Sequence, residues 1–285
     1  LPTETVYGLA ALINSPLGID KIFEIKERPF FDPLIVHVGS VEQAKTCTTE
    51  WSKECDLLEK KFWPGPLTLV LPKSDFISDK ITSGLTTVGI RMPKHSLALE
   101  LLNQLGHPLA APSANKFKKT SPTTSEHVLN SFPDLFCLDG GPCEVGIEST
   151  ILGFEAGRPV IYRPGMITAS QIEECLETNV FIKESPVAPG HLKHHYMPNT
   201  PIITYINTTK LELREEVSKD LLRSATHWKL PAHATEAARE LYSKLRELDQ
   251  AQASAIVISY SNEQFIDPLF QGIFNRLQKA SKYFI

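Results

Sequence analysis

The sequence lacks the two glycine-rich signatures with which many nucleotide-binding folds hold phosphates. Neither a GxxxxGK[ST] loop nor a GxGxxG turn occurs in the 285 residues. If this chain binds a nucleotide, side-chain cations and hydroxyl groups must hold it instead.

Cysteine pairs and long apolar runs are also missing. The cysteines are odd in number and show no CxxC spacing, which favours a reduced, cytoplasmic setting over a disulfide framework or a zinc finger. No apolar run approaches the roughly 18 residues of a membrane span, and no signal peptide is visible. We therefore expect no membrane association. The five cysteines are Cys47, Cys55, Cys137, Cys143 and Cys175.

Excess positive charge is absent as well. The net charge is −4 and the isoelectric point is near 6.2, which argues against a protein whose main task is to bind nucleic-acid backbones. Hydrophobic residues make up 42% of the chain, enough for a real core, and the length allows one large domain or two smaller ones.

Short β-branched runs alternate with helical patterns through the first part of the chain, which predicts an α/β domain with a twisted sheet over residues 1–180. Residues 181–200 are rich in proline and histidine and have little periodicity, so we expect a linker. Residues 201–285 predict a smaller α/β domain that closes with a helix over 271–280. We find no internal repeats.

The segment 26–37 (KERPFFDPLIVH) runs from a predicted helix into a predicted strand. Lys26 and Arg28 lie two residues apart at the turn, where they can face an anion such as a polyphosphate. The simpler interpretation is a solvated pair of charges on a helix end. His37 follows at the strand end, where a structural role is the more common one.

Other short motifs surround this turn in a fixed order. They are residues 2–9 (PTETVYGL), 63–68 (WPGPLT), 88–93 (VGIRMP), 111–115 (APSAN) with 121–123 (SPT), 146–150 (GIEST) and 163–165 (RPG). Together they resemble the YrdC-like threonylcarbamoyl-AMP synthases over residues 1–165. The segment 188–198 (APGHLKHHYMP) resembles the linker of the long form of that family, which carries a C-terminal domain.

The resemblance implies a YrdC-like twisted mixed sheet with flanking helices, followed by a smaller Rossmann-like α/β domain. It also implies a strand and a helix before Leu1. It assigns Lys26 and Arg28 to catalysis and to ATP. The L-threonine site would consist of Thr3, His37, Arg91, the backbone at Ala111, and Ser149. The remaining ATP contacts would be Asp32, Thr87, Ser113, Ser121, Arg163 and Tyr196.

Several of these residues have simpler interpretations from their local sequence. Thr3 has the context of a helix N-cap at a strand-to-helix junction, and Arg163 that of a strand-end charge. Ser121 is predicted at a helix N-terminus, which favours anions. Arg91, between apolar neighbours, must reach water or meet an anion.

Two positions depart from the family pattern, and the milder change is Ala10, where the family usually has glycine. Asp32 stands where the family usually has asparagine, and a carboxylate near phosphates needs Mg²⁺ or a neighbouring cation. The histidines at 191, 194 and 195 lack a completing cysteine or carboxylate, so we expect no resident metal site. Mg²⁺ would arrive with ATP.

The implied activity is L-threonylcarbamoyladenylate synthesis from L-threonine, bicarbonate or CO₂, and ATP, a nucleotidyltransferase reaction. The product would serve tRNA processing, as separate proteins transfer it to make N6-threonylcarbamoyladenosine. Two alternatives stay open: a carbamoyltransferase of the hydrogenase-maturation type and an RNA-binding module. The purpose of the C-terminal domain, a homodimer and weak tRNA binding also stay open.

Overall fold

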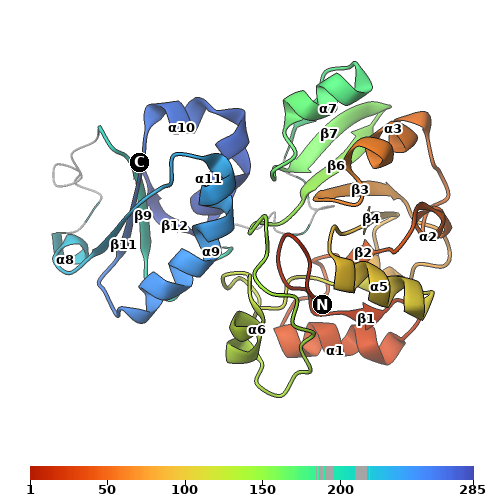
Figure 1. The fold of residues 1–285 in the computed structure, drawn as a ribbon, viewed down its shortest axis with the longest axis horizontal. Helices are drawn as coiled ribbons and strands as arrows, with labels where there is room; N and C mark the ends of the chain where they lie inside the picture. The colour runs from red at the N-terminus through yellow and green to blue at the C-terminus, as the bar shows by residue number, and fades with distance from the viewer. Residues whose placement is uncertain (184, 186–188, 190–194, 209–216, 218) are drawn as a thin grey trace.

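The chain folds into two α/β domains that lie side by side in a computed structural model (Figure 1). The structure describes residues 1–183, 185, 189, 195–208, 217 and 219–285. Within these ranges no helix is long and apolar enough to cross a membrane.

The first domain contains the elements β1 (Ala11–Leu12), α1 (Pro16–Lys26), β2 (Ile35–His37), α2 (Val41–Thr46), α3 (Lys53–Phe62), β3 (Leu67–Pro72), α4 (Asp79–Thr82), β4 (Thr87–Arg91), α5 (Ser96–Leu105), β5 (Leu109–Ala110), α6 (Ser125–Ser131), β6 (Thr150–Glu155), β7 (Arg158–Arg163), α7 (Ala169–Leu176) and β8 (Phe181–Ile182). Its strands form one sheet in the order β1-β5-β2-β4-β3-β6-β7-β8. The sheet contains both parallel and antiparallel pairs, so the predicted mixed sheet is confirmed.

Helix α1 shows how the sequence brings a charge inward. Its buried residues Ile19, Ile22, Phe23 and Lys26 follow the i, i+3, i+4, i+7 spacing of one helix face. Lys26 therefore ends an apolar stripe and is 1% exposed. The helix stops at once, because Glu27 adopts a left-handed conformation with φ of 54°. The interpretation of Lys26 as a solvated charge is wrong.

The second domain contains β9 (Ile202–Ile206), α8 (Lys219–Leu222), β10 (Thr226–Lys229), α9 (Ala234–Gln250), β11 (Ile256–Tyr260), α10 (Asn262–Ile266), the 3₁₀ turn η2 (Pro268–Phe270), α11 (Gln271–Ala280) and β12 (Ser281–Phe284). Its four strands are all parallel, in the order β10-β11-β9-β12, as a Rossmann-like unit requires.

Two expectations need correction. The chain does not close on a helix, since β12 follows α11 directly and pairs with β9. The predicted linker also begins too early: Phe181 and Ile182 form β8, which pairs with β7 at the edge of the first sheet. Both strands are short, and β8 is exposed, so neither gives a clear alternating pattern in the sequence. Half of the remaining linker, residues 183–200, lies outside the described residues.

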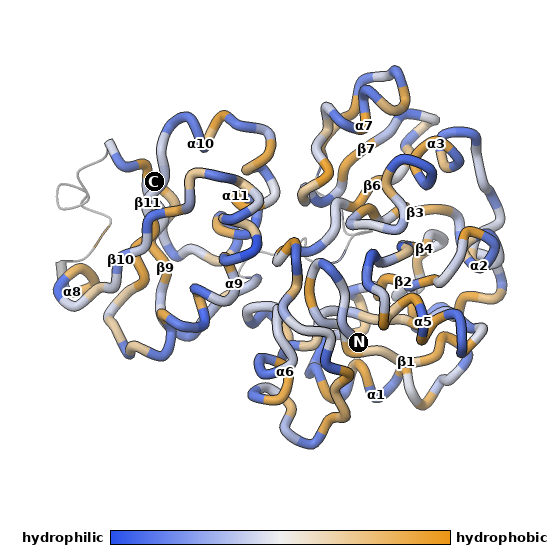
Figure 2. The backbone as a smooth tube through the Cα atoms, viewed as in Figure 1, coloured by the Kyte–Doolittle hydropathy of each residue, from blue (hydrophilic) through white to orange (hydrophobic). Residues whose placement is uncertain are grey.

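Helices α9 and α11 lie on the side of the second domain that faces the first (Figure 1). Their buried apolar residues join one core cluster that also includes Val6 and Ile147 of the first domain. Figure 2 shows that apolar and polar residues both occur along these helices, as expected of helices with one buried face.

Glycines let the backbones approach each other at the boundary. A Cβ on Gly146 would lie 2.4 Å from the Cα of Arg239 in α9. A Cβ on Gly272 in α11 would lie 2.9 Å from backbone atoms of Gly165. Gly146 and Gly165 belong to the motifs 146–150 and 163–165, so the second domain rests directly on two candidate site segments.

We expect Gly272→Ala to destabilise the protein, although glycine-to-alanine changes inside helices usually stabilise by about 1 kcal/mol. The reason is that the new methyl group would collide with backbone, which cannot move aside as a side chain can. Urea unfolding of the variant measures the effect, and Gln278→Ala, at an exposed position of the same helix, is the control. A Gly272→Ala protein as stable as the control variant would contradict the close contact.

Candidate active site

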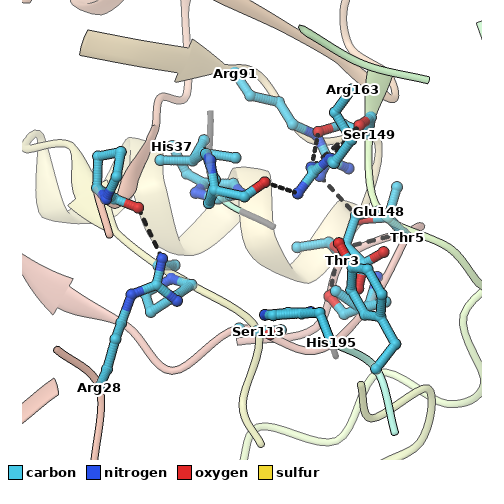
Figure 3. Close-up of a pocket in the computed structure, with 18 residues that line it drawn as sticks. Thr3, Thr5, Arg28, His37, Arg91, Ser113, Glu148, Ser149, Arg163 and His195 are labelled. Carbon is cyan, nitrogen blue, oxygen red and sulfur yellow. Dashed lines mark hydrogen bonds between the residues drawn. The ribbon is translucent and has the colours of Figure 1, made fainter. Parts of the chain in front are cut away.

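A pocket lies where the ends of the central strands meet the segments 2–8, 111–113 and 146–149, and Figure 3 shows the 18 residues that line it. Nine of the thirteen predicted site residues are among them: Thr3, Arg28, His37, Arg91, Ala111, Ser113, Ser149, Arg163 and Tyr196. Segments that are far apart in the sequence thus converge on one cavity.

Arg91 is 4% exposed at the end of β4 and meets an internal carboxylate rather than water. Its Nη2 lies 2.7 Å from Oε2 of Glu4, its Nη1 donates to Oγ1 of Thr5 at 2.8 Å, and its Nε donates to the carbonyl of Gly65. The register of β2 and β4 places His37 opposite Arg91. The motif 2–9 therefore supplies the acidic partner of this arginine.

Thr3 precedes a bend at Glu4 and Thr5 and no helix starts there, so its interpretation as an N-cap is wrong. Its hydroxyl accepts from the backbone N–H groups of Thr5 and Val6 and donates to the carbonyl of Val6 at 2.6 Å. These bonds fix a tight local turn at the pocket wall.

Arg28 and Asp32 form a buried ion pair with a separation of 3.0 Å between Nη2 and Oδ2. Arg28 also donates to the carbonyls of Asp32 and Pro33. The carboxylate of Asp32 makes no well-aligned hydrogen bond within the part of the chain that the structure describes. A neighbouring cation thus balances the charge of Asp32, one of the two conditions that the sequence required.

Lys26 does not line the pocket but lies just behind it. Its Nζ donates to the carbonyls of Ser113 and, at 2.6 Å, Asn115. Burial and then the charge of Arg28 lower the pKa of Lys26 well below its usual range.

Arg163, at the end of β7, likewise meets backbone oxygens. Its Nε and Nη2 donate to the carbonyl of Ser149 at 3.2 and 3.1 Å, Nη2 also reaches Oγ of Ser149, and Nη1 donates to the carbonyl of Pro189. Its place at a strand end agrees with the simpler interpretation, but the side chain is 5% exposed and so lies inside the protein.

The buried charges do not balance. Within the described ranges, the buried charged residues are Lys26, Arg28, Arg91, Arg163, Arg276, Glu4, Asp32 and Glu148. Three ion pairs join Arg28 to Asp32, Arg91 to Glu4, and Arg276 to Glu148. Lys26 and Arg163 remain without a carboxylate partner among these residues. Because carbonyl groups satisfy hydrogen bonds but cancel no charge, the site has room for an anion.

Glu148 is a pocket residue that the sequence did not single out. Its Oε1 accepts from Ser121 at 2.6 Å, and its Oε2 accepts from Tyr242 and Arg276, both at 2.9 Å. Burial alone would raise the pKa of Glu148, but the charges of Arg276 and Arg163 outweigh burial and lower it to about 2. Glu148 is therefore charged throughout the physiological range.

Ser121 is not at a helix N-terminus as expected, because α6 starts at Ser125 with Thr124 as its cap. Thr87 lies in a smaller adjoining cavity together with Thr68 and Gly89. Pro33, Ile35 and Pro189 line both this cavity and the main pocket, so these residues lie at the boundary between the two.

His195 and Tyr196 cover the pocket from the linker side. Their rings meet edge to face with centroids 4.1 Å apart, and Tyr196 has a φ of 65°. The hydroxyl of Tyr196 is buried and has no hydrogen-bond partner in the described chain. Such a group costs free energy unless a ligand satisfies it. The sequence predicted Tyr196 but gave no signal for His195, which in a HHY run reads as solvent-exposed.

Comparison with known proteins agrees with this arrangement. The family model described as telomere recombination matches residues 1–165, and the model for the threonylcarbamoyl-AMP synthase C-terminal domain matches residues 167–282. The chain belongs to the threonylcarbamoyl-AMP synthase family.

Relatives of that name include one from Pyrococcus abyssi, 37% identical over 99% of this chain and 89% of its own length. Another, from Schizosaccharomyces pombe, is 31% identical over 98% of this chain and 84% of its own length. The Bacillus subtilis protein is 44% identical over 70% of this chain and 61% of its own length. The crystal structure of P. abyssi Sua5 with L-threonine superposes with a TM-score of 0.88 at 34% identity, covering 99% of this chain and 89% of that one.

The buried side chain of His37 should make the free energy of unfolding depend on pH. Burial, and then the charge of Arg91, lower the pKa of His37 from 6.5 to about 3. Between these values the unfolded chain binds a proton that the folded chain does not, so stability falls as the pH falls below 6.5.

We expect the wild-type protein to lose about 2 kcal/mol more free energy of unfolding than His37→Gln between pH 7 and pH 5. Urea unfolding at both pH values measures the difference. Glu148 does not contribute, because its pKa lies near 4.5 when unfolded and about 2 when folded. Equal losses in the two proteins would show that His37 accepts a proton in the folded state.

Proposed function

We propose that this chain is an L-threonylcarbamoyladenylate synthase, which converts L-threonine, bicarbonate or CO₂, and ATP into threonylcarbamoyl-AMP and pyrophosphate. The observation that carries the proposal is the pair of buried cations, Lys26 and Arg163, that have only carbonyl and hydroxyl partners among the described residues. A triphosphate would supply the missing negative charge and could replace these carbonyls as acceptor.

The other end of the pocket suits an amino acid. Arg91 and Thr5 offer donors to a carboxylate, and Ser149 and Thr3 offer hydroxyls. Neutral His37 lies in the same wall and could accept from an amine or a hydroxyl. The relative crystallised with L-threonine supports this assignment.

The reaction needs no protein nucleophile. The threonine amine adds to CO₂ and loses a proton, which gives a carbamate. A carbamate oxygen then attacks the α-phosphorus, the bond to the β-phosphate oxygen breaks, and pyrophosphate leaves. The protein holds three substrates in line and stabilises the charge that develops on phosphate oxygens, for which Lys26, Arg28 and Arg163 are placed.

We propose that Mg²⁺ enters with ATP and not at a resident site. The described residues contain no group of three histidine, cysteine, aspartate or glutamate side chains that could hold a metal. Phosphate oxygens and water are the ligands that Mg²⁺ prefers, so ATP itself supplies what the pocket does not. Bound there, the ion would neutralise phosphate charge.

The remaining assignments are proposals from the family alone. The product would pass to tRNA threonylcarbamoyl-transfer proteins. A cytoplasmic location is consistent with five free cysteines.

The described cysteines form no metal cluster, so the carbamoyltransferase with zinc-finger cysteines has no support here. The unpaired cations are buried in a pocket and not spread over an exposed face, which disfavours an RNA-binding module.

We expect pyrophosphate release from ATP and bicarbonate that depends on L-threonine. Lys26→Ala and Arg91→Ala should each lower kcat/KM by roughly 100-fold or more, since each removes a buried charge that meets substrate. Lys80→Ala, which removes an exposed ion pair with Asp20, is the control and should keep full activity. A folded wild-type chain that binds ATP but releases no pyrophosphate with threonine would refute the proposed reaction.

A further inference from the structure

Arg276 reaches from the second domain into the wall of the pocket. It belongs to α11, is fully buried, and donates from Nε to Oε2 of Glu148 at 2.9 Å and from Nη2 to the carbonyl of Glu148 at 3.0 Å. Its Nη1 donates to the carbonyl of Pro164, next to Arg163. One side chain thus holds both motifs, 146–150 and 163–165.

Other side chains complete the setting of Glu148. Tyr242, also from the second domain, donates to the same carboxylate oxygen as Arg276, while Ser121 donates to the other oxygen. The guanidinium of Arg276 lies 5.5 Å from the ring centre of Tyr196, which stacks on Tyr242 at 5.9 Å. The second domain therefore fixes a carboxylate and a tyrosine that both line the pocket.

The charge of Glu148 matters because of where it lies. It is the one carboxylate among the described residues that line the main pocket, and it is close enough to Arg163 and Lys26 to affect their protonation. An unneutralised carboxylate in a buried anion site repels phosphate and competes with it for the cations. Arg276 supplies the neutralising charge from outside the first domain.

We propose that Arg276 is a positioning residue of the active site, which neutralises and orients Glu148 so that the pocket accepts the phosphates of ATP. The inference rests on the proposed function, because ATP is the anion concerned. It gives the second domain a role that its sequence did not reveal: it contributes charge balance to a site formed by the first domain.

The test is calorimetric titration of ATP and, separately, of L-threonine into the full chain and its variants. Arg276→Gln should weaken ATP binding roughly 10- to 100-fold, the scale of one unit charge across partly screened protein. L-threonine binding should change by less than about threefold, because a zwitterion carries no net charge. Arg276→Lys, which keeps the charge, should lie between the wild type and Arg276→Gln.

Two further variants separate charge balance from domain contact. Glu148→Gln combined with Arg276→Gln removes both charges and should bind ATP more tightly than Arg276→Gln alone. Arg246→Gln is the control: Arg246 also crosses the domain boundary and is half-buried, but its hydrogen bond goes to the carbonyl of Thr120 and not to Glu148. It should bind ATP like the wild type.

The inference is overturned if folded Arg276→Gln binds ATP as the wild type does, or if Arg246→Gln loses as much affinity as Arg276→Gln. Circular dichroism and thermal melts establish folding. If Arg276→Gln does not fold, the double variant decides: it should bind ATP within about tenfold of the wild type, and a larger loss overturns the inference. A wild-type chain that binds neither ATP nor pyrophosphate overturns the proposed function as well, whereas an active wild type with an unaffected Arg276→Gln overturns this inference alone.

Discussion

The structure depends on a buried site in which positively charged side chains outnumber negatively charged ones. Burying an ion costs several kcal/mol unless a partner offsets the cost, and a surplus of cations is tolerated only where an anion is expected. Here three arginines have carboxylate partners, while Lys26 and Arg163 rely mainly on carbonyl oxygens. Helix α1, the strand ends and the motifs 146–150 and 163–165 hold these groups around one cavity.

The same constraint explains why two domains are joined so closely. The carboxylate of Glu148 accepts a hydrogen bond from Ser121, yet it opposes a phosphate unless it is neutralised. The neutralising group comes from α11, and α11 can reach the loop only because Gly272 and Gly165 allow their backbones to meet. Docking and electrostatics are therefore parts of one arrangement.

Much of the fold and of the candidate site could be predicted from the sequence, because both depend on short-range patterns and on motifs. The strand runs and capped helices predicted two α/β domains, and the motif order, through the family resemblance, implied the mixed sheet, the Rossmann-like second domain and nine of the pocket residues. The residues and strands that the sequence did not predict depend on contacts between distant parts of the chain. Nothing near Arg276 or Tyr242 marks them as site residues, since their partner lies more than 90 positions away. Similarly, β8 and β12 are too short to show a period and exist through pairing with β7 and β9.

A crystal structure of the chain with a non-hydrolysable ATP analogue and L-threonine would test the central claim most directly. The account predicts phosphate oxygens within hydrogen-bond distance of Nζ of Lys26 and of the guanidinium of Arg163, with Ser113 and Pro189 no longer their acceptors. It also predicts that Arg276 still donates hydrogen bonds to Glu148 in this complex. Phosphates bound elsewhere, with Lys26 and Arg163 still on their carbonyl partners, would contradict the account.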